Sequence, residues 1–322
     1  MGKSFHLMKF LFISPRYSGG IGGHASMLAD QLINEGYDVK KMIIPHIPIK
    51  NLKNPSFAML GTIKGIMNRE QYDIVHAFNV PSAFAMNYVQ GKKKILSIHG
   101  VFSEQIEKLH SRPLSSIASL TESKIIKWAD RLTTDSKFSK QIYEEKYGLD
   151  FEYLPSPIDT NKMNMIKNTN KKEKQIIYLG RNSYEKGIDI LKKIESKING
   201  KVVFCIDKSW EDAMELLKSS SILVVPSRME SLPTNIKEAF YLKVPVIATS
   251  VGGIPELVEQ NKTGILVEPE NPKVLLDKIN QLIDDEILQQ KFSINGYNFI
   301  KKNFTWEKIL PDYIKFYKNL FN

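Results

Sequence analysis

The sequence holds a single cysteine, Cys205, among 322 residues. One cysteine cannot form a disulfide within the chain, so a disulfide-stabilised secreted scaffold is excluded and a reducing compartment is favoured. Long apolar runs are also missing, because the longest, such as 10–14 and 222–226, hold about five residues, against about 20 in a membrane-spanning helix. The N-terminal stretch is broken by Lys9 and lacks a small-residue cleavage site, which indicates a first strand rather than a signal peptide. We therefore expect a cytoplasmic protein.

Low-complexity sequence is absent too, and the apolar (42%) and charged (25%) fractions are those of an ordered globular protein. The net charge of +10 is spread over both halves of the chain. Such an excess fits nucleic acid, anionic lipid headgroups or a phosphorylated substrate equally well. The lysine clusters 92–94 and 171–172 lack the interleaved aromatic residues of single-strand binders. We expect them to be solvated surface, and no nucleic-acid partner is predicted.

Short runs of β-branched and aromatic residues alternate with helical patterns along the chain. The predicted strands are 10–14, 39–44, 73–77, 95–99, 131–134, 176–179, 202–206, 222–225, 246–249 and 264–267. This alternation is typical of parallel sheets with helices on both faces. The pattern pauses around 155–159, so we predict an N-terminal Rossmann-like domain of residues 1–157 and a second of residues 158–302. Residues 303–322 form an apolar-striped helix that should pack back on the first domain.

In the first half, a glycine loop at 18–23 follows the first strand and is expected to open a helix at about His24. Backbone amides at such a helix start suit phosphate, although a flexible turn explains the glycines equally well. The G-x-G-x-x-G spacing of dinucleotide-binding folds is not present, which disfavours a nicotinamide oxidoreductase. His99 follows a strand, at the edge where open α/β sheets bind ligands, but a structural histidine is the alternative. His76 lies inside a strand and is expected to be buried.

In the second half, Arg181 closes a strand and Lys186 opens the next helix, so the two cations could neutralise a diphosphate. Ordinary surface charges are the alternative. Glu230 and Glu238 are eight residues apart, one before and one inside a helix predicted to begin at Pro233. If helical throughout, this spacing is about 12 Å, which is too long for a paired acid and base on one bond. No cluster with metal-ligand spacing is present, so neither a metal nor a cofactor is predicted.

Taken in order, these residues resemble the retaining glycosyltransferases of family 4, which have the two-domain GT-B fold. The segment Glu230-Ser-Leu-Pro-Thr-Asn-Ile-Lys-Glu238 is similar to the E-x7-E signature of that family. Further similar segments are 245–256, Thr263-Gly264, Gly180-Arg181, Glu185-Lys186-Gly187, the glycine loop with Leu28 and Ala29, Ile98-His99-Gly100, and 129–136. The resemblance spans nearly the whole chain.

The resemblance implies an α/β GT-B architecture, in which two Rossmann-like domains with parallel sheets face a central cleft that holds the active site. By the same resemblance, Arg181 and Lys186 bind the donor diphosphate, Glu238 the ribose and Glu230 the transferred sugar, while His99 contacts the sugar near the reacting carbon. The implied catalytic residues are His99, Arg181, Lys186 and Glu230. The implied donor-binding residues are Gly22, Gly23, Arg181, Lys186, Glu230, Leu232, Pro233, Thr234 and Glu238.

Two segments depart from the family pattern. Residues 207–210 join the strand at 202–206 directly to the next helix, where the family usually has a further strand-helix unit that helps to hold the nucleobase. We therefore expect the second domain to be shortened by about one strand-helix unit, with Trp210 either packing there or offering a stacking surface. Residues 155–159 stand where many relatives have Asn-Gly after the proline, which changes the hinge rather than the chemistry.

The sequence therefore predicts a retaining, metal-independent hexosyl- or N-acetylhexosaminyltransferase of polysaccharide or glycolipid biosynthesis. It would move a sugar from a UDP- or GDP-sugar, or a similar nucleotide sugar, to a glycan or lipid-linked acceptor. Acceptor choice is expected to lie in the loops 45–55 and 102–113, and the basic first domain would contact the anionic inner face of the membrane. The alternatives are a sugar-nucleotide epimerase or a phosphorylase on the same fold, and a non-catalytic glycan-binding scaffold.

Overall fold

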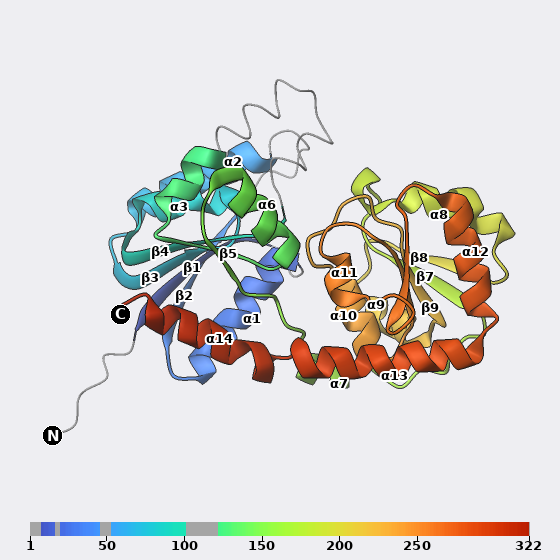
Figure 1. The fold of residues 1–322 in the computed structure, drawn as a ribbon. Coiled ribbons are helices and arrows are strands. Elements are labelled where there is room, and N and C mark those ends of the chain that lie inside the picture. Colours follow the sequence, from blue (N-terminus) through green and yellow to red (C-terminus); the bar gives the residue numbers. More distant parts are fainter. Residues whose placement is uncertain (1–7, 17–19, 46–52, 101–121, 322) are drawn as a thin grey trace. The chain divides into compact units, whose positions relative to one another are not determined.

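The computed structural model describes residues 8–16, 20–45, 53–100 and 122–321. The chain divides into two compact units, unit 1 with residues 1–154 and 310–322, and unit 2 with residues 155–309 (Figure 1). Of the two loops expected to select the acceptor, residues 102–113 and 46–52 lie outside the described residues. No helix in the described part of the chain combines the length and the apolar character that crossing a bilayer requires.

Unit 1 is built on a parallel six-stranded sheet in the order β2-β1-β3-β4-β5-β6. Its strands are β1 (Lys9–Pro15), β2 (Asp38–Ile44), β3 (Gln71–Ala77), β4 (Gln90–Ile98), β5 (Arg131–Thr134) and β6 (Phe151–Tyr153). From Phe10 onward, the residues of β1 are buried on both faces of the sheet, as expected for a strand covered by helices on each side. By contrast, β2 exposes Lys40 and Lys41, which suits a sheet edge because charged side chains oppose further strand pairing.

Helices cover both faces of the unit 1 sheet (Figure 1). They are α1 (Gly20–Asn34), α2 (Lys53–Met67), α3 (Ala83–Tyr88), α6 (Lys137–Tyr147) and the unit 1 part of α14 (Trp306–Asn319), with short 3-10 turns at Val80–Ser82 and Ile126–Trp128. One core joins α2, α3 and α6 to the sheet. On the opposite face, the ring of Tyr317 from α14 packs edge-on against Phe10 of β1, with the ring centroids 5.1 Å apart.

Unit 2 has a parallel five-stranded sheet in the order β11-β10-β9-β7-β8. Its strands are β7 (Gln175–Leu179), β8 (Lys201–Cys205), β9 (Ile222–Val225), β10 (Val246–Thr249) and β11 (Gly264–Val267). Its helices are α7 (Thr160–Asn164), α8 (Ile188–Ile194), α9 (Trp210–Ser219), α10 (Thr234–Tyr241), α11 (Ile254–Leu257), α12 (Pro272–Ile283), α13 (Glu286–Asn303) and the first residues of α14, with 3-10 turns at Tyr184–Lys186 and Glu195–Lys197.

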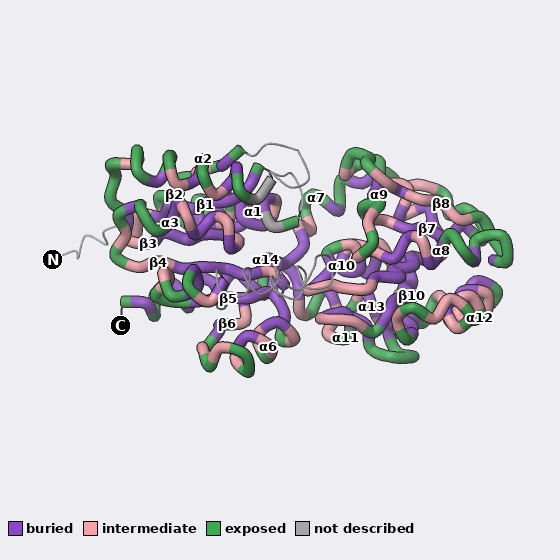
Figure 2. The backbone as a smooth tube through the Cα atoms, turned by 90° about the horizontal axis from the view of Figure 1, so that it is seen from above, coloured by how far each residue is buried: buried purple, intermediate pink, exposed green. Residues whose placement is uncertain are grey.

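Two cores flank the unit 2 sheet, one with α8 and α12 and the other with α7, α9, α10, α11 and α13. In Figure 2 the central strands of each unit are buried, β2 is largely exposed, and the helices alternate between buried and exposed residues. β8 leads directly into α9 through residues 206–209, and the Ser209 hydroxyl caps α9 by accepting from the Asp212 N–H at 3.1 Å. The direct connection from this strand to the next helix, which the sequence predicts, is confirmed.

The structure confirms every predicted strand and corrects two helix starts. α1 begins at Gly20 rather than at about His24, because Gly20 has a φ of +56° that a glycine adopts without strain. α10 begins at Thr234, and Pro233 is its extended N-cap rather than its first helical residue. The three-residue β6 was not predicted, since so short an edge strand leaves little periodicity to detect.

Candidate functional site

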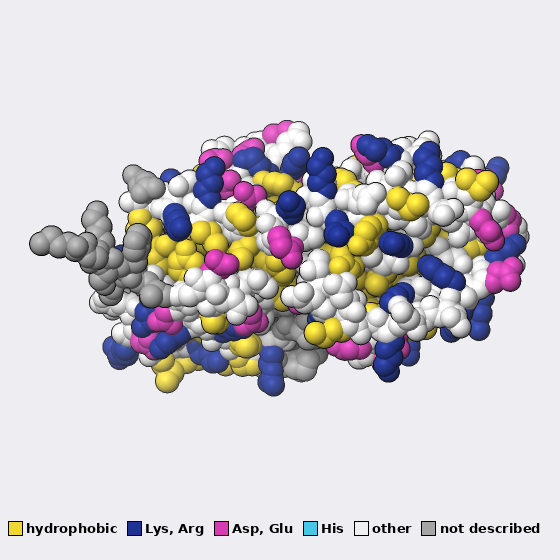
Figure 3. Space-filling model, turned by 90° about the horizontal axis from the view of Figure 1, so that it is seen from below, with side chains coloured by type: hydrophobic (Ala, Val, Ile, Leu, Met, Phe, Trp, Pro, Cys, Tyr) yellow, Lys and Arg dark blue, Asp and Glu magenta, His cyan; other side chains and the backbone are white. Residues whose placement is uncertain are grey.

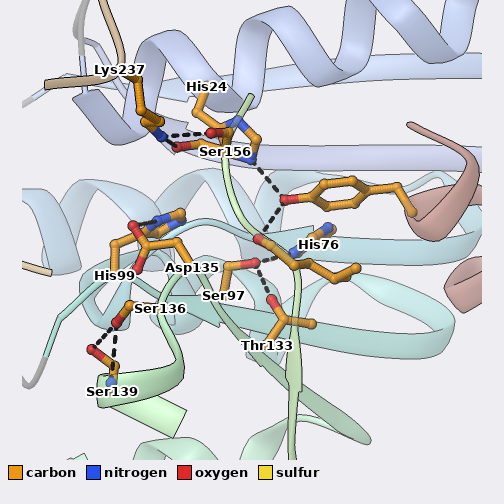
Figure 4. A network of polar contacts seen from close by, with 12 residues as sticks. His24, His76, Ser97, His99, Thr133, Asp135, Ser136, Ser139, Ser156 and Lys237 are labelled. Carbon is orange, nitrogen blue, oxygen red and sulfur yellow. Dashed lines mark hydrogen bonds and ion pairs between the residues drawn. The ribbon is translucent and has the colours of Figure 1, made fainter. Parts of the chain in front are cut away.

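His99 and Asp135 lie side by side at the carboxyl end of the unit 1 sheet (Figure 4). β4 and β5 are parallel and pair Ile98 with Thr134, so the next residue of each strand emerges at the same edge. His99 Nδ1 is 3.1 Å from Asp135 Oδ2, and the two side chains are 9% and 7% exposed. The sequence analysis singled out His99 but missed Asp135, although a carboxylate directly after the neighbouring strand was a readable signal.

The carboxylate fixes the orientation of the imidazole. An ionised Asp135 can only accept, so it accepts from His99 Nδ1–H, and the other ring nitrogen, Nε2, is directed away from Asp135. Nε2 is buried and has no hydrogen-bond partner among the residues that the structure describes. A buried ring nitrogen without a partner is costly unless a ligand supplies one. Nε2 is therefore the ring nitrogen of His99 that has no partner among the described residues.

A second histidine, His24 in α1, lies next to His99, with the ring centroids 5.8 Å apart and nearly perpendicular. The Tyr313 hydroxyl donates to the Leu154 carbonyl at 2.9 Å, so it must accept from His24 Nε2–H at 3.0 Å. Gly22 and Gly23, predicted to contact the donor, lie in α1 just before His24. We call His24, His99 and Asp135 the histidine site; sequence reasoning missed His24 because the expected helix start placed it in the turn.

His76 supports this site from inside the sheet. Its Nδ1 is 2.9 Å from the Tyr317 hydroxyl and its Nε2 is 2.6 Å from Ser97 Oγ, which is in turn 2.5 Å from Thr133 Oγ1 (Figure 4). Burial first, and then the neighbouring His24 and His99, lower the pKa of His76 well below its usual range. His76 is thus a neutral structural residue, and the prediction that it is buried is confirmed.

In unit 2, the loop with Arg181 and Lys186 is fastened to the loop with Glu230. The Glu185 carbonyl accepts from the Arg228 N–H at 2.8 Å and from the Met229 N–H at 3.3 Å. Gly187 has a φ of +64°, and a Cβ there would lie 1.9 Å from the Pro226 carbonyl oxygen. Only a glycine permits this approach, so the two loops hold their charged side chains together.

The contact between these loops is an ion pair. Lys186 Nζ is 2.7 Å from Glu230 Oε1, and the Ser227 hydroxyl donates to the same oxygen at 2.9 Å. Glu230 is 7% exposed and Lys186 24%, so the charges are only partly hydrated. The backbone of Glu230 is held as well, because Gly252, with a φ of +55°, would place a Cβ 1.9 Å from its carbonyl oxygen. This explains the glycine at position 252, in the loop after β10.

Arg181 is held at its backbone and exposed at its tip. The Tyr178 hydroxyl donates to the Arg181 carbonyl at 2.6 Å, whereas the guanidinium is 70% exposed and contacts Glu185 Oε1 at 3.0 Å. Burial raises the pKa of Tyr178 above its usual range, so the hydroxyl stays a donor. The Arg181 side chain is therefore open to solvent, in the same loop as Lys186.

Glu238 lies on α10, where Trp210 Nε1 donates to its Oε1 at 2.8 Å. Burial raises the pKa of Glu238, while the Trp210 hydrogen bond and the charges of Lys237 and Lys162 act in the opposite direction. We call Arg181, Lys186, Glu230 and Glu238 the two-glutamate site. Of the other predicted residues, Leu232 and Pro233 are buried and Thr234 is exposed at the first turn of α10.

The start of α10 is tied down on two sides. Asn235 Nδ2 donates to the Leu179 carbonyl at the end of β7, at 2.8 Å. Lys237 is fully buried, and its Nζ donates to the Ser156 carbonyl at 2.6 Å and lies 2.9 Å from Ser156 Oγ (Figure 4). Glu238 is thus presented by a helix whose position is fixed. Within the described ranges, no three His, Cys, Asp or Glu side chains gather as a metal site would need.

Two family models match the chain. Residues 29–162 match Glycosyltransferase Family 4, and residues 192–299 match Glycosyl transferases group 1. An uncharacterised glycosyltransferase of Methanocaldococcus jannaschii is 28% identical, with 94% of this chain and 95% of the relative covered.

Two solved structures share the fold over nearly the whole chain. Sucrose-phosphate synthase from Thermosynechococcus elongatus superposes with a TM-score of 0.81 at 17% identity, covering 98% of this chain and 99% of the other. Anabaena HepE, solved in complex with UDP-glucose, superposes with a TM-score of 0.71 at 15% identity, covering 97% and 100%. Together with the motif order and the two parallel sheets, these matches show that the chain belongs to the family 4 glycosyltransferases and has their GT-B fold.

Proposed function

We propose that this glycosyltransferase is a retaining enzyme that takes its sugar from a nucleotide sugar. The observation that carries the proposal is the fastened pair of loops in unit 2, which sets Lys186 against Glu230, with Arg181 paired to Glu185 in the same loop as Lys186. Cations suit a diphosphate and a carboxylate suits sugar hydroxyls, so the pair matches the two linked parts of such a donor. Glu238, on a fixed helix, would accept hydrogen bonds from the ribose.

The proposed reaction occurs on one face of the sugar. The acceptor hydroxyl attacks the anomeric carbon as the bond to the diphosphate oxygen breaks, and the leaving diphosphate takes the hydroxyl proton. Negative charge therefore grows on the diphosphate, where Arg181 and Lys186 stabilise the transition state more than the ground state. His99 would contact the transferred sugar through Nε2, which Asp135 orients. In this proposal the two side-chain cations serve the diphosphate and no metal ion is needed.

The donor is proposed to be a UDP- or GDP-linked hexose or N-acetylhexosamine, and the acceptor a glycan or a lipid-linked glycan. Support comes from HepE, whose structure contains UDP-glucose, although its likeness to this chain is one of fold. An epimerase would release no acceptor product, and a phosphorylase would need inorganic phosphate instead of a nucleotide. An assay that detects sugar transfer from a nucleotide sugar to an acceptor, without inorganic phosphate, therefore separates a transferase from both alternatives.

The first experiment is thermal unfolding with UDP, GDP, ADP and their common sugar conjugates. A ligand at 100 times its dissociation constant adds about 2.7 kcal/mol to the unfolding free energy. We expect one nucleotide to raise the midpoint, and we expect Glu238→Ala to reduce this shift strongly while the exposed Glu195→Ala keeps it. No shift with any nucleotide would contradict the donor site and favour the non-catalytic scaffold.

Turnover tests the diphosphate role directly. Arg181→Ala should lower the donor turnover rate by about 10²–10³, the usual loss for one contact to developing charge. Arg69→Ala, which removes another exposed arginine side chain, in unit 1, is the matched control and should leave the rate unchanged. Addition of EDTA should change neither rate. An Arg181→Ala enzyme as fast as the wild type would remove Arg181 from the mechanism.

We also propose that unit 1 contacts an anionic membrane, as a lipid-linked acceptor would require. α2 exposes Met59, Ile63, Ile66 and Met67 beside Lys64, a combination typical of helices that lie in the membrane interface. Figure 3 views the chain from below, the side of unit 1 away from α2, and there lysine, arginine and acidic side chains lie scattered among hydrophobic ones. Flotation with vesicles containing phosphatidylglycerol should exceed flotation with phosphatidylcholine alone, and equal flotation would contradict the proposal.

A further inference from the structure

We propose that Trp210 is a positioning residue for the donor, because its indole N–H holds the carboxylate of Glu238 in its binding orientation. The inference rests on the proposed function, in which Glu238 binds the donor ribose. The bond from Trp210 Nε1 to Glu238 Oε1 is 2.8 Å long and links α9 to α10. Nothing in the E-x7-E motif itself supplies this contact, since Trp210 stands 20 residues before Glu230.

The shortened unit 2 is what brings Trp210 to this place. β8 ends at Cys205, and residues 206–209 lead directly into α9, whose first residue is Trp210. The Ser209 cap fixes the start of α9, so the indole is presented by the first turn of a helix rather than by a loop. A further strand-helix unit between β8 and α9 would separate Trp210 from this connection. The same departure from the family pattern thus supplies a new support for Glu238.

The surroundings of the ring favour support over base stacking. Lys162 Nζ lies 3.9 Å from the ring centroid, so one face of the indole is already occupied by a cation. The rest of the side chain packs against the core that α9 and α10 share. Lys162 is itself drawn toward α9 by Glu211, with 3.4 Å between Nζ and Oε1. A nucleobase could stack on the covered face only by displacing Lys162.

The indole also has the right chemistry for a partly buried carboxylate. An indole N–H can donate but not accept, so it stabilises an ionised oxygen and fixes which of the two oxygens it binds. The other carboxylate oxygen then keeps a defined direction toward a ligand. The groups that face Glu238 are Trp210 from α9, Lys162 from α7 and Lys237 from its own helix, and each of them lowers the pKa of Glu238 against the effect of burial.

The test compares four proteins by calorimetric titration with UDP, with GDP and ADP in parallel. They are the wild type, Trp210→Phe, Glu238→Ala and the double variant. Trp210→Phe keeps an aromatic ring for Lys162 and the core but removes the N–H. We expect it to weaken binding of the nucleotide about tenfold, as loss of one hydrogen bond to a charged group does. In the Glu238→Ala background the same change should have no further effect, because its action passes through Glu238.

The pH profile separates positioning from packing. Without the indole hydrogen bond, the pKa of Glu238 should rise further, so Trp210→Phe should lose the nucleotide at a higher pH than the wild type as the solution is acidified. Loss of a residue that only packs would leave unchanged the pH at which nucleotide binding is lost. If Trp210→Phe does not fold, Glu238→Gln tests the role of Glu238 instead. It leaves Trp210 unchanged and should abolish the loss of nucleotide binding on acidification. If Glu238→Gln still loses the nucleotide at the same acidic pH as the wild type, the inference is overturned.

Trp128→Phe is the matched control, since Trp128 packs edge-on against Phe84 in unit 1 and should not affect the titration. If the wild type binds one nucleotide and Trp210→Phe binds it equally well, the inference is wrong and the donor site stands. If the wild type binds none of the three, the proposed function fails and the inference fails with it. The two failures are therefore distinguishable in one set of titrations.

Discussion

At the scale of single residues, the pair of His99 and Asp135 gives the most specific prediction about unit 1. If Asp135 orients the imidazole, Asp135→Asn should lower the turnover rate on the order of 10²-fold with little change in the KM for the donor, because a misplaced contact acts on the transition state. Asp130→Asn is the matched control, since Asp130 precedes β5 and binds the Lys94 N–H instead. Equal rates for the two variants would contradict an orienting role for Asp135.

His76 gives a prediction about stability and pH. Its pKa is well below the usual value in the folded chain and near 6.5 in the unfolded chain, so below pH 6.5 the unfolded state binds more protons. Stability should therefore be complete above pH 6.5 and fall on acidification, by up to about 1.4 kcal/mol per pH unit. Urea unfolding of wild type and His76→Gln between pH 7.5 and 5.5 checks this, and parallel curves for the two proteins would refute it.

The sequence predicts some of the site residues, such as His99 and Glu238, but not the residues that they contact. His99 could be singled out because the residue after a buried parallel strand lies at the ligand-binding edge of the sheet. The position of Asp135 directly after the neighbouring strand was readable, but its contact with His99 depends on strand register, which no local pattern states. His24 was missed because its position depends on where α1 begins. The contact between Trp210 and Glu238 escaped for the same reason, since it depends on how α9 packs on α10.

At the scale of elements, the two fastened loops of unit 2 depend on Gly187. A side chain there meets the Pro226 carbonyl and also an unfavourable φ, whereas Gly148 has nearly the same φ, +63°, and open space around its Cβ position. Gly148→Ala should therefore cost about 1–2 kcal/mol of unfolding free energy from φ alone. Gly187→Ala should cost more and also weaken UDP binding, as measured by urea unfolding and titration. Equal losses of stability with unchanged UDP binding would contradict the role of the loop contact.

Elements themselves were the most predictable part of this chain. Strands buried on both faces, such as β9 and β10, leave apolar runs that end at clear turn residues. The places where prediction failed are backbone conformations rather than hydrophobic patterns: the left-handed Gly20 that starts α1 early and the extended Pro233 that delays α10. Both lie next to predicted donor-binding residues, so the uncertain boundaries fell where the chemistry was expected.

At the scale of the whole molecule, unit 1 is completed by the last residues of the chain. Tyr313 and Tyr317 are buried, and their hydroxyls bind His24, the Leu154 carbonyl and His76. Removing one large buried aromatic side chain costs about 3–5 kcal/mol, and a domain is stable by only about 5–15 kcal/mol. Unit 1 should therefore fail to fold in a chain that ends at Ile309, although residues 1–154 hold its entire sheet.

Unit 2 contains all of residues 155–309 and should keep its fold in that truncated chain. Hydrogen exchange read by mass spectrometry would then show rapid exchange in β1 and β3 and protection in β9 and β10. A chain that ends at Leu320 is the control, since it loses the exposed Phe321 and keeps both tyrosines. Protected β1 and β3 amides in the chain ending at Ile309 would mean that the sheet of unit 1 forms without α14. In that case the buried hydroxyls of α14 would serve to place His24 and His76 rather than to hold unit 1 together.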